Sequence, residues 1–157
     1  MQAQGPARKW NGDGISKSER HDPDMKTSSK IESFRDLKVW QKSMDLVELA
    51  YDVAELLEEK RKYRLADQIY GSSTSMPSDI AEGFGQGSRV AYAKYIRDAR
   101  TSSFELDTQL EIVRRRKLVD PELLTRAKAL LLDVGRGLTA LQKSLERRPS
   151  RIQGLSP

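Results

Sequence analysis

The chain has 157 residues, of which 32% are charged and 37% hydrophobic, so it is long enough for one domain with a real core. It has no cysteine, which excludes disulfides, thiolate metal sites and cysteine nucleophiles, and its one histidine, His21, lies in a polar stretch. No apolar run approaches the roughly 20 residues of a membrane helix, and no apolar signal segment opens the chain. We therefore expect a cytoplasmic protein that needs no membrane, metal or cofactor.

The net charge of +5 is unevenly distributed along the chain. Residues 1–33 and residues 34–146 each carry only one excess positive charge, whereas residues 147–157 contain three arginines and no acid. A basic composition alone is thus weak evidence for nucleic-acid binding, and local clustering must decide. We predict a disordered N-terminal tail over residues 1–32, a folded region over 33–146 and a basic C-terminal tail over 147–157.

A first helix is predicted from about Ser33, because Ser33 and Asp36 fit a capping box. Its apolar residues alternate in steps of three and four, which predicts a packing seam: Leu37, Trp40, Met44, Val47, Tyr51 and Ala54. A second apolar row flanks this seam: Leu46, Leu49, Val53, Leu56 and Leu57. One bundle face needs only one seam, so this helix is also expected to contact a neighbouring subunit.

A second helix is predicted over about residues 64–82. Pro77 interrupts its hydrogen bonding, so we expect a kink there, and Gly83 is expected to end the helix with a positive φ. A third helix begins after a glycine-rich turn, with Ser88 as its N-cap, and extends to about Lys117. Its seam is the longest in the chain: Tyr92, Ile96, Ala99, Ser103, Leu106, Leu110 and Val113.

A fourth helix begins at Asp120 and Pro121, which suit the N-cap and the first helical position. Its apolar stripe comprises Leu123, Ala127, Leu130, Leu131, Val134, Leu138, Leu141 and Leu145, with Gly135 and Gly137 between them. Short connections join all four predicted helices, and consecutive helices joined in this way pack antiparallel. The sequence therefore predicts an all-α fold, an antiparallel up-down-up-down four-helix bundle.

Basic residues cluster around the first and third predicted turns, which such a bundle places at one end. The candidate nucleic-acid-binding residues are Lys60, Arg61, Lys62, Arg64, Arg114, Arg115, Arg116 and Lys117. One interpretation is an end that contacts the phosphates of RNA or DNA. The other is that these cations stabilise helix C-termini, at about 0.3–1 kcal/mol each, and acids nearby dilute them. The two interpretations can coexist.

Three further patterns have a structural and a functional interpretation. The stretch from Gly83 to Arg89 lacks the lysine of a phosphate-binding loop and follows a helix, which favours a tight turn over an anion site. Asp79 and Glu82 lie one turn apart, but the predicted bundle has no histidine, so a structural role is favoured over a metal. Trp40 and Tyr51 lie on the first seam, which favours core packing over base stacking.

Three segments in the right order carry a resemblance to a known family. They are residues 34–41 (FRDLKVWQ), 75–85 (SMPSDIAEGFG) and 99–110, which opens ARTSSFEL and closes with Gln109 and Leu110. Over about residues 34–145 the chain resembles the four-helix-bundle family of proteins encoded in intervening sequences of bacterial 23S rRNA genes. That family also includes the accessory variability protein of diversity-generating retroelements.

The resemblance implies a homo-oligomeric ring of four-helix bundles, typically a pentamer. In the retroelement branch it implies binding to nucleic acid and to a reverse transcriptase; in the other branch, gene location suggests RNA or ribosome association. The family usually has Asn where this chain has Asp79, and often a basic pair in the region of Tyr70 to Thr74, which this chain lacks. The end around Arg61 and Arg114 is therefore the better candidate for nucleic acid.

Two functions follow as hypotheses. The first is a non-enzymatic oligomeric adaptor that binds RNA or DNA, together with a reverse transcriptase. The alternative is a protein-protein assembly module, a homo-oligomeric ring without a nucleic-acid role, which the nearly neutral folded region favours. An enzyme is the least favoured class, because the predicted bundle contains no histidine or cysteine for acid-base or nucleophilic chemistry.

Overall fold

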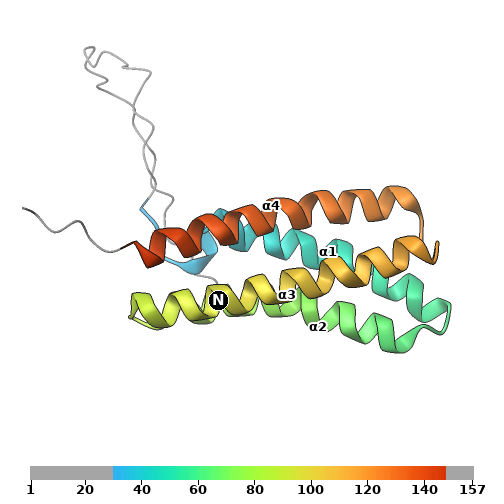
Figure 1. Cartoon of the computed structure of the whole chain (residues 1–157), viewed down its shortest axis with the longest axis horizontal. Helices are drawn as coiled ribbons and strands as arrows, with labels where there is room; N and C mark the ends of the chain where they lie inside the picture. Colours follow the sequence, from blue (N-terminus) through green and yellow to red (C-terminus); the bar gives the residue numbers. More distant parts are fainter. Residues whose placement is uncertain (1–29, 148–157) are drawn as a thin grey trace, which may run out of the picture. The chain divides into compact units, whose positions relative to one another are not determined.

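The computed structural model describes residues 30–147, and the predicted tails fall almost entirely outside this range. A short 3-10 turn, η1 (Phe34–Asp36), precedes four α-helices: α1 (Lys38–Glu59), α2 (Tyr63–Phe84), α3 (Arg89–Arg115) and α4 (Pro121–Glu146). The described part of the chain contains no strand. Each helix runs antiparallel to the one before it, and the four form an up-down-up-down bundle (Figure 1). The predicted all-α four-helix bundle is confirmed.

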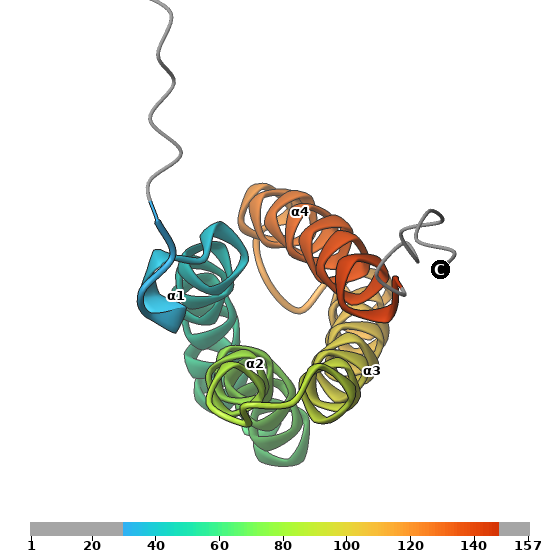
Figure 2. The ribbon, with the colours of Figure 1, turned by 90° about the vertical axis from the view of Figure 1, so that its left-hand side faces the viewer.

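The helices occupy the corners of a square in chain order, so that α1 packs on α2 and α4, and α3 packs on α2 and α4 (Figure 2). Buried aliphatic side chains from all four helices fill the space between them, among them Leu46, Leu57, Ile69, Met76, Ile80, Ile96, Leu106, Leu110, Val134 and Leu138. Burial of such apolar surface is the main favourable contribution to folding. Because the helices follow this order around the square, the pair α1–α2 and the pair α3–α4 form opposite sides of the bundle.

The capping box of Ser33 is present, but it caps η1 rather than α1. Asp36 accepts a hydrogen bond from the Ser33 amide at 2.8 Å, and the Ser33 hydroxyl accepts one from the Arg35 amide at 3.2 Å. Leu37 then adopts an extended conformation, and α1 begins only at Lys38. The expectation that the helix itself starts near Ser33 was therefore wrong by one short turn.

The buried face of α1 differs from the first predicted seam. The helix buries Ser43, Leu46, Val47, Ala50, Val53, Ala54 and Leu57, whereas Met44 and Tyr51 are exposed. Trp40 is half-buried and meets the Phe34 ring edge-on, with the two ring centroids 5.3 Å apart. Tyr51 packs edge-on against Tyr70, with their ring centroids 4.6 Å apart. Core packing holds in part for Trp40 and is wrong for Tyr51. The second apolar row supplies Leu46, Val53 and Leu57 to the core, whereas the first seam supplies only Val47 and Ala54.

Gly83 lies inside α2 rather than after its end. The helix continues to Phe84 with Gly85 as its C-cap, and Gly83 is buried. A Cβ atom on Gly83 would lie 2.6 Å from Cδ2 of Tyr92 and 2.9 Å from Cβ of Tyr95. The glycine thus allows the close approach of α2 and α3, and the predicted C′ role was wrong.

The helix starts predicted for the second half of the chain are confirmed. The Ser88 hydroxyl accepts a hydrogen bond from the Ala91 amide at the start of α3, and the Asp120 carboxylate accepts one from the Glu122 amide at the start of α4. The predicted α3 seam is buried apart from Tyr92, which is half-buried. α2 continues through Pro77, and the kink there stays a prediction.

Candidate nucleic-acid interface

The α1–α2 turn and the α3–α4 turn lie at the same end of the bundle, seen at the right of Figure 1. We call this the basic end. It carries all eight predicted residues, which fall within residues 60–64, around the α1–α2 turn, and residues 114–117, where α3 ends. The opposite end holds the glycine-rich α2–α3 turn and the C-terminus of α4 (Figure 1). The antiparallel topology thus brings two basic segments that are some fifty residues apart in sequence to one end.

Both helices that finish at the basic end do so with the same hydrogen-bond pattern. In α1, the Lys62 amide donates to the Leu57 carbonyl at 2.8 Å and the Arg61 amide to the Glu58 carbonyl at 2.8 Å. In α3, the Leu118 amide donates to the Val113 carbonyl and the Lys117 amide to the Arg114 carbonyl, both at 3.1 Å. This is the Schellman motif, which satisfies the carbonyls left unpaired at a helix C-terminus.

The motif requires a left-handed residue just after the helix, and here a cation fills that position twice. Arg61 has φ 58° and Lys117 has φ 51°, and they are the two non-glycine residues with positive φ in the described chain. Glycine is usual at this position, since a side chain there costs about 1–2 kcal/mol. The fold therefore places two long basic side chains at matching positions of the two turns at this end, at a conformational cost.

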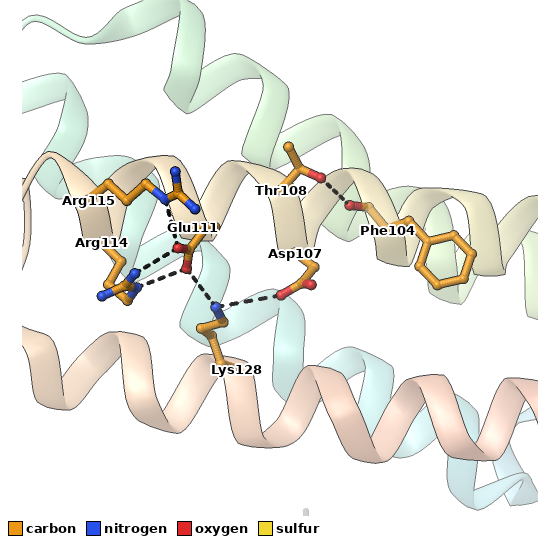
Figure 3. Close-up of polar contacts among 7 residues, drawn as sticks. All are labelled: Phe104, Asp107, Thr108, Glu111, Arg114, Arg115 and Lys128. Atoms are coloured by element: carbon orange, nitrogen blue, oxygen red, sulfur yellow. Dashed lines mark hydrogen bonds and ion pairs between the residues drawn. The ribbon is translucent and has the colours of Figure 1, made fainter.

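Glu111 neutralises part of the predicted cluster (Figure 3). Its carboxylate accepts hydrogen bonds from Arg114 at 2.7 and 2.8 Å, from Arg115 at 2.9 Å and from Lys128 of α4 at 3.0 Å. These bonds, led by that from Arg114, hold the pKa of Glu111 well below its usual range, and Glu111 in turn raises the pKa of Arg114. Arg114 and Arg115 are thus paired with an acid of their own helix, and Lys128 joins the same carboxylate from α4.

The other six predicted cations have no acidic partner within 4.0 Å among residues 30–147, and all six are exposed. They are Lys60, Arg61, Lys62, Arg64, Arg116 and Lys117. Exposed, unpaired cations are free to contact phosphate oxygens without first breaking an ion pair. Whether this end binds nucleic acid stays a prediction, but the structure separates six available cations from two that are engaged.

Lys128 belongs to the same charged network and was missed in the sequence. It lies on α4, 3.0 Å from Glu111 and 3.8 Å from Asp107, so only the packing of α4 on α3 brings it there (Figure 3). The acid-base spacing of Glu111 with Arg114 and Arg115 is the one signal that points to this network from sequence.

The carboxylates at the end of α2 are not arranged as a metal site. Burial, together with the nearby Asp98 and Glu82, raises the pKa of Asp79 to about 6, and Lys94 opposes this shift. Within residues 30–147 no group of three or more His, Asp or Glu side chains is placed to hold a metal ion. No helix in the same range is long and apolar enough to cross a lipid bilayer.

The fold and the charged end define a class of protein, a small antiparallel four-helix bundle that carries a cluster of exposed cations at one end. Residues 35–140 match the family described as 23S rRNA-intervening sequence protein. Because this match spans more than half of the chain, the chain belongs to that family. The family predicted from the three sequence segments is confirmed.

A solved structure shares the fold. It is described as a protein with unknown function from the S23 ribosomal protein family of Bacteroides thetaiotaomicron VPI-5482. The two superpose with a TM-score of 0.64 at 21% identity, over 67% of this chain and 98% of the other. At that identity the likeness concerns the fold alone. No match is found among curated proteins.

Proposed function

We propose that this chain is a non-enzymatic, self-assembling adaptor that binds the phosphate backbone of RNA or DNA through its basic end. The observation that carries the proposal is the pair of left-handed cations, Arg61 and Lys117, at matching positions of the two turns at this end. Residues held in unfavourable backbone conformations persist where the surroundings impose them, and they concentrate at functional sites. The four exposed cations beside them add to the positive potential of that end.

Membership of the 23S rRNA-intervening sequence protein family supports the same proposal, because the family's name ties its genes to ribosomal RNA. The resemblance to retroelement accessory proteins adds a reverse transcriptase as the proposed protein partner, and a homo-oligomer, typically a pentamer, as the proposed assembly. A cytoplasmic location follows from such partners.

Binding of a structured RNA hairpin, titrated by fluorescence anisotropy at several salt concentrations, tests the proposal. Replacing Lys60, Arg61 and Lys62 with Gln should weaken binding and flatten the dependence of log K on log salt, by about 0.7–0.9 for each phosphate that the variant no longer neutralises. Arg114 and Arg115 are poor targets for this test because Glu111 already engages them.

The matched control removes three exposed cations towards the opposite end that form no ion pair among residues 30–147, with Arg35, Lys38 and Arg147 replaced by Gln. It lowers the net charge equally but should leave most of the affinity and the salt slope intact. Equal losses in the two triple variants would show that charge, not the basic end, governs binding. If the wild-type protein does not bind RNA or DNA at low salt, the result would favour the alternative, an assembly module without a nucleic-acid role.

A further inference from the structure

A cavity of about 460 Å³ opens beside the turn between α3 and α4, at the basic end. Three cations line it: Arg114 from the last turn of α3, Lys117 from the turn itself and Lys128 from α4. No acid among residues 30–147 lines this cavity, whereas Asp107 lines a larger groove between the same two helices. The cavity has the size of a small-molecule site, and its cations select an anion.

Two of the three cations are oriented before any ligand arrives. Arg114 directs Nε and Nη2 at Glu111, which leaves its Nη1 without a hydrogen-bond partner among residues 30–147 (Figure 3). Half-buried Lys128 donates to the same carboxylate at 3.0 Å. Lys117 is exposed and has no ion pair in that range, so it supplies the charge that no acid offsets. Side chains fixed in this way lose less entropy when an anion binds.

The rest of the wall suits a nucleobase. Val119, Pro121 and Leu124 line it, and flat bases pack against apolar as well as aromatic side chains. The Thr125 hydroxyl donates its hydrogen to the Pro121 carbonyl at 2.9 Å, so its oxygen is left to accept a hydrogen bond from a base or a ribose. A phosphate on the cations and a base on the apolar wall thus account for both kinds of lining.

We propose that this cavity holds the last nucleotide of an RNA or DNA strand, with its terminal phosphate on the three cations. A terminal phosphate is a monoester with a charge of about −1.5 to −2 near pH 7, whereas each internal phosphate carries a single negative charge. A duplex cannot enter a cavity of this size, but the end of a single strand can. The proposal rests on nucleic-acid binding through the basic end and adds the part of the strand that is recognised.

The exposed cations of the α1–α2 turn complete the contact. Lys60, Arg61 and Lys62 lie at the same end of the bundle as the cavity, so they can neutralise internal phosphates of a strand that ends in it (Figure 1). A free nucleotide is the competing occupant, because it carries the same phosphate monoester. It has no internal phosphates, however, and therefore gains nothing from the α1–α2 turn.

Three forms of one RNA test the proposal by fluorescence anisotropy at about 100 mM salt. The RNA is a hairpin with single-stranded overhangs and an internal label, made with a 5′-phosphate, with a 3′-phosphate or with hydroxyls at both ends. At least one phosphorylated form should bind at least about fivefold more tightly than the hydroxyl form. The form that does so gives the polarity of the bound strand. Free uridine 5′-monophosphate should compete only at a concentration at least about a hundredfold higher.

Two cavity variants locate the effect, and one neighbour serves as the control. Lys117→Asn removes the unpaired cation where Asn tolerates a positive φ, and Thr125→Asp adds an acid at an exposed position of the wall. Each should reduce the preference for the phosphorylated end to less than about twofold. Arg116→Gln removes an exposed cation that does not line the cavity, so it should weaken all three RNAs alike. Circular dichroism confirms that each variant is folded.

Equal binding of the three RNAs by the wild-type protein overturns the strand-end site and leaves binding through the basic end in place. If none of them binds at low salt, the proposed function fails as well. A phosphate preference that survives both Lys117→Asn and Thr125→Asp places the recognition elsewhere and overturns the site. Competition by uridine 5′-monophosphate at the same concentration as the phosphorylated RNA also overturns it, because the cavity then belongs to a free nucleotide.

Discussion

Glu111 accepts two hydrogen bonds from Arg114, at 2.8 Å from Nε and 2.7 Å from Nη2, one turn further along α3. The same carboxylate accepts hydrogen bonds from Arg115 and Lys128, so one half-buried acid engages three cations near the basic end. Side chains held in this way offer less positive charge to an outside phosphate. If the basic end binds RNA as proposed, Glu111 limits the affinity of that end.

Replacing Glu111 with Gln should strengthen RNA binding, because the amide releases the three cations. We expect a gain of about threefold to tenfold near 100 mM salt and a steeper salt dependence, measured by anisotropy titration. Glu105→Gln on the same helix is the control, since Glu105 forms no ion pair among residues 30–147. Unchanged affinity in the Glu111 variant would place these cations outside the interface.

Replacing Arg61 with Gly should stabilise the fold while weakening RNA binding. Glycine adopts the left-handed conformation of Arg61 without strain, so urea denaturation should show a gain of about 1 kcal/mol. The lost cation should reduce the salt slope by about 1. Arg64→Gly, in the first turn of α2, is the matched control, and it should lose affinity without the gain in stability, because Arg64 has no left-handed conformation to relieve. A destabilised Arg61→Gly protein would contradict the strain argument.

Replacing Asp79 with Asn should change how stability depends on pH. Burial and the neighbouring Asp98 and Glu82 raise the pKa of Asp79 to about 6, from 3.8. The folded state thus binds a proton more tightly than the unfolded state, so this group's contribution is fully present below pH 4 and is lost as pH rises through 6. Asn cannot ionise and escapes this loss.

Urea denaturation at several pH values measures the difference between the two proteins. The advantage of the Asn variant should grow between pH 4 and 7 and then stay constant, at a value on the order of 1 kcal/mol after allowance for solvent screening. Glu82→Gln, an exposed neighbour on the same helix, should give a smaller change. A pH-independent difference would show that the Asp79 carboxyl titrates normally in the folded protein.

Replacing Gly83 with Ala should destabilise the bundle by about 1–3 kcal/mol, because the new methyl group overlaps Tyr92 and Tyr95 and pushes α2 from α3. Gly71→Ala in the same helix is the control. A Cβ atom there meets nothing within 4 Å, so the alanine should stabilise α2 by about 0.5–1 kcal/mol. Thermal melts of the two variants should therefore move in opposite directions. A neutral Gly83→Ala would mean that the tyrosines rearrange freely.

The sequence predicted the burial of α3 better than that of α1. Apolar residues of α3 form one row with an Ala and Ser centre, so a single face was available to bury. α1 has two apolar rows offset by two residues, and periodicity alone cannot choose between them. Its contacts with α2 and α4 decide in favour of Leu46 and Val53, which leaves Met44 exposed.

The candidate site was predictable only in part, for a similar reason. The antiparallel topology follows from short connections, and it places Arg61 and Arg114 at one end without further information. The engagement of Lys128 by Glu111 depends on the register of α4 against α3, which local spacing does not contain. The positive φ angles of Arg61 and Lys117 could not be predicted either, because neither position holds glycine, the usual indicator of that conformation.

The guanidinium of Arg89, at the start of α3, donates hydrogen bonds to the carbonyls of Ser144 at 2.6 Å and Leu145 at 3.3 Å. These bonds fix the last turn of α4 beside the first turn of α3, at the end remote from Arg61 and Lys117. A tag or surface anchor attached after Arg147 therefore starts from a fixed point on the far side of the molecule. Immobilising the protein in this way should leave its cations facing the solution, which suits it to biosensor measurements with RNA.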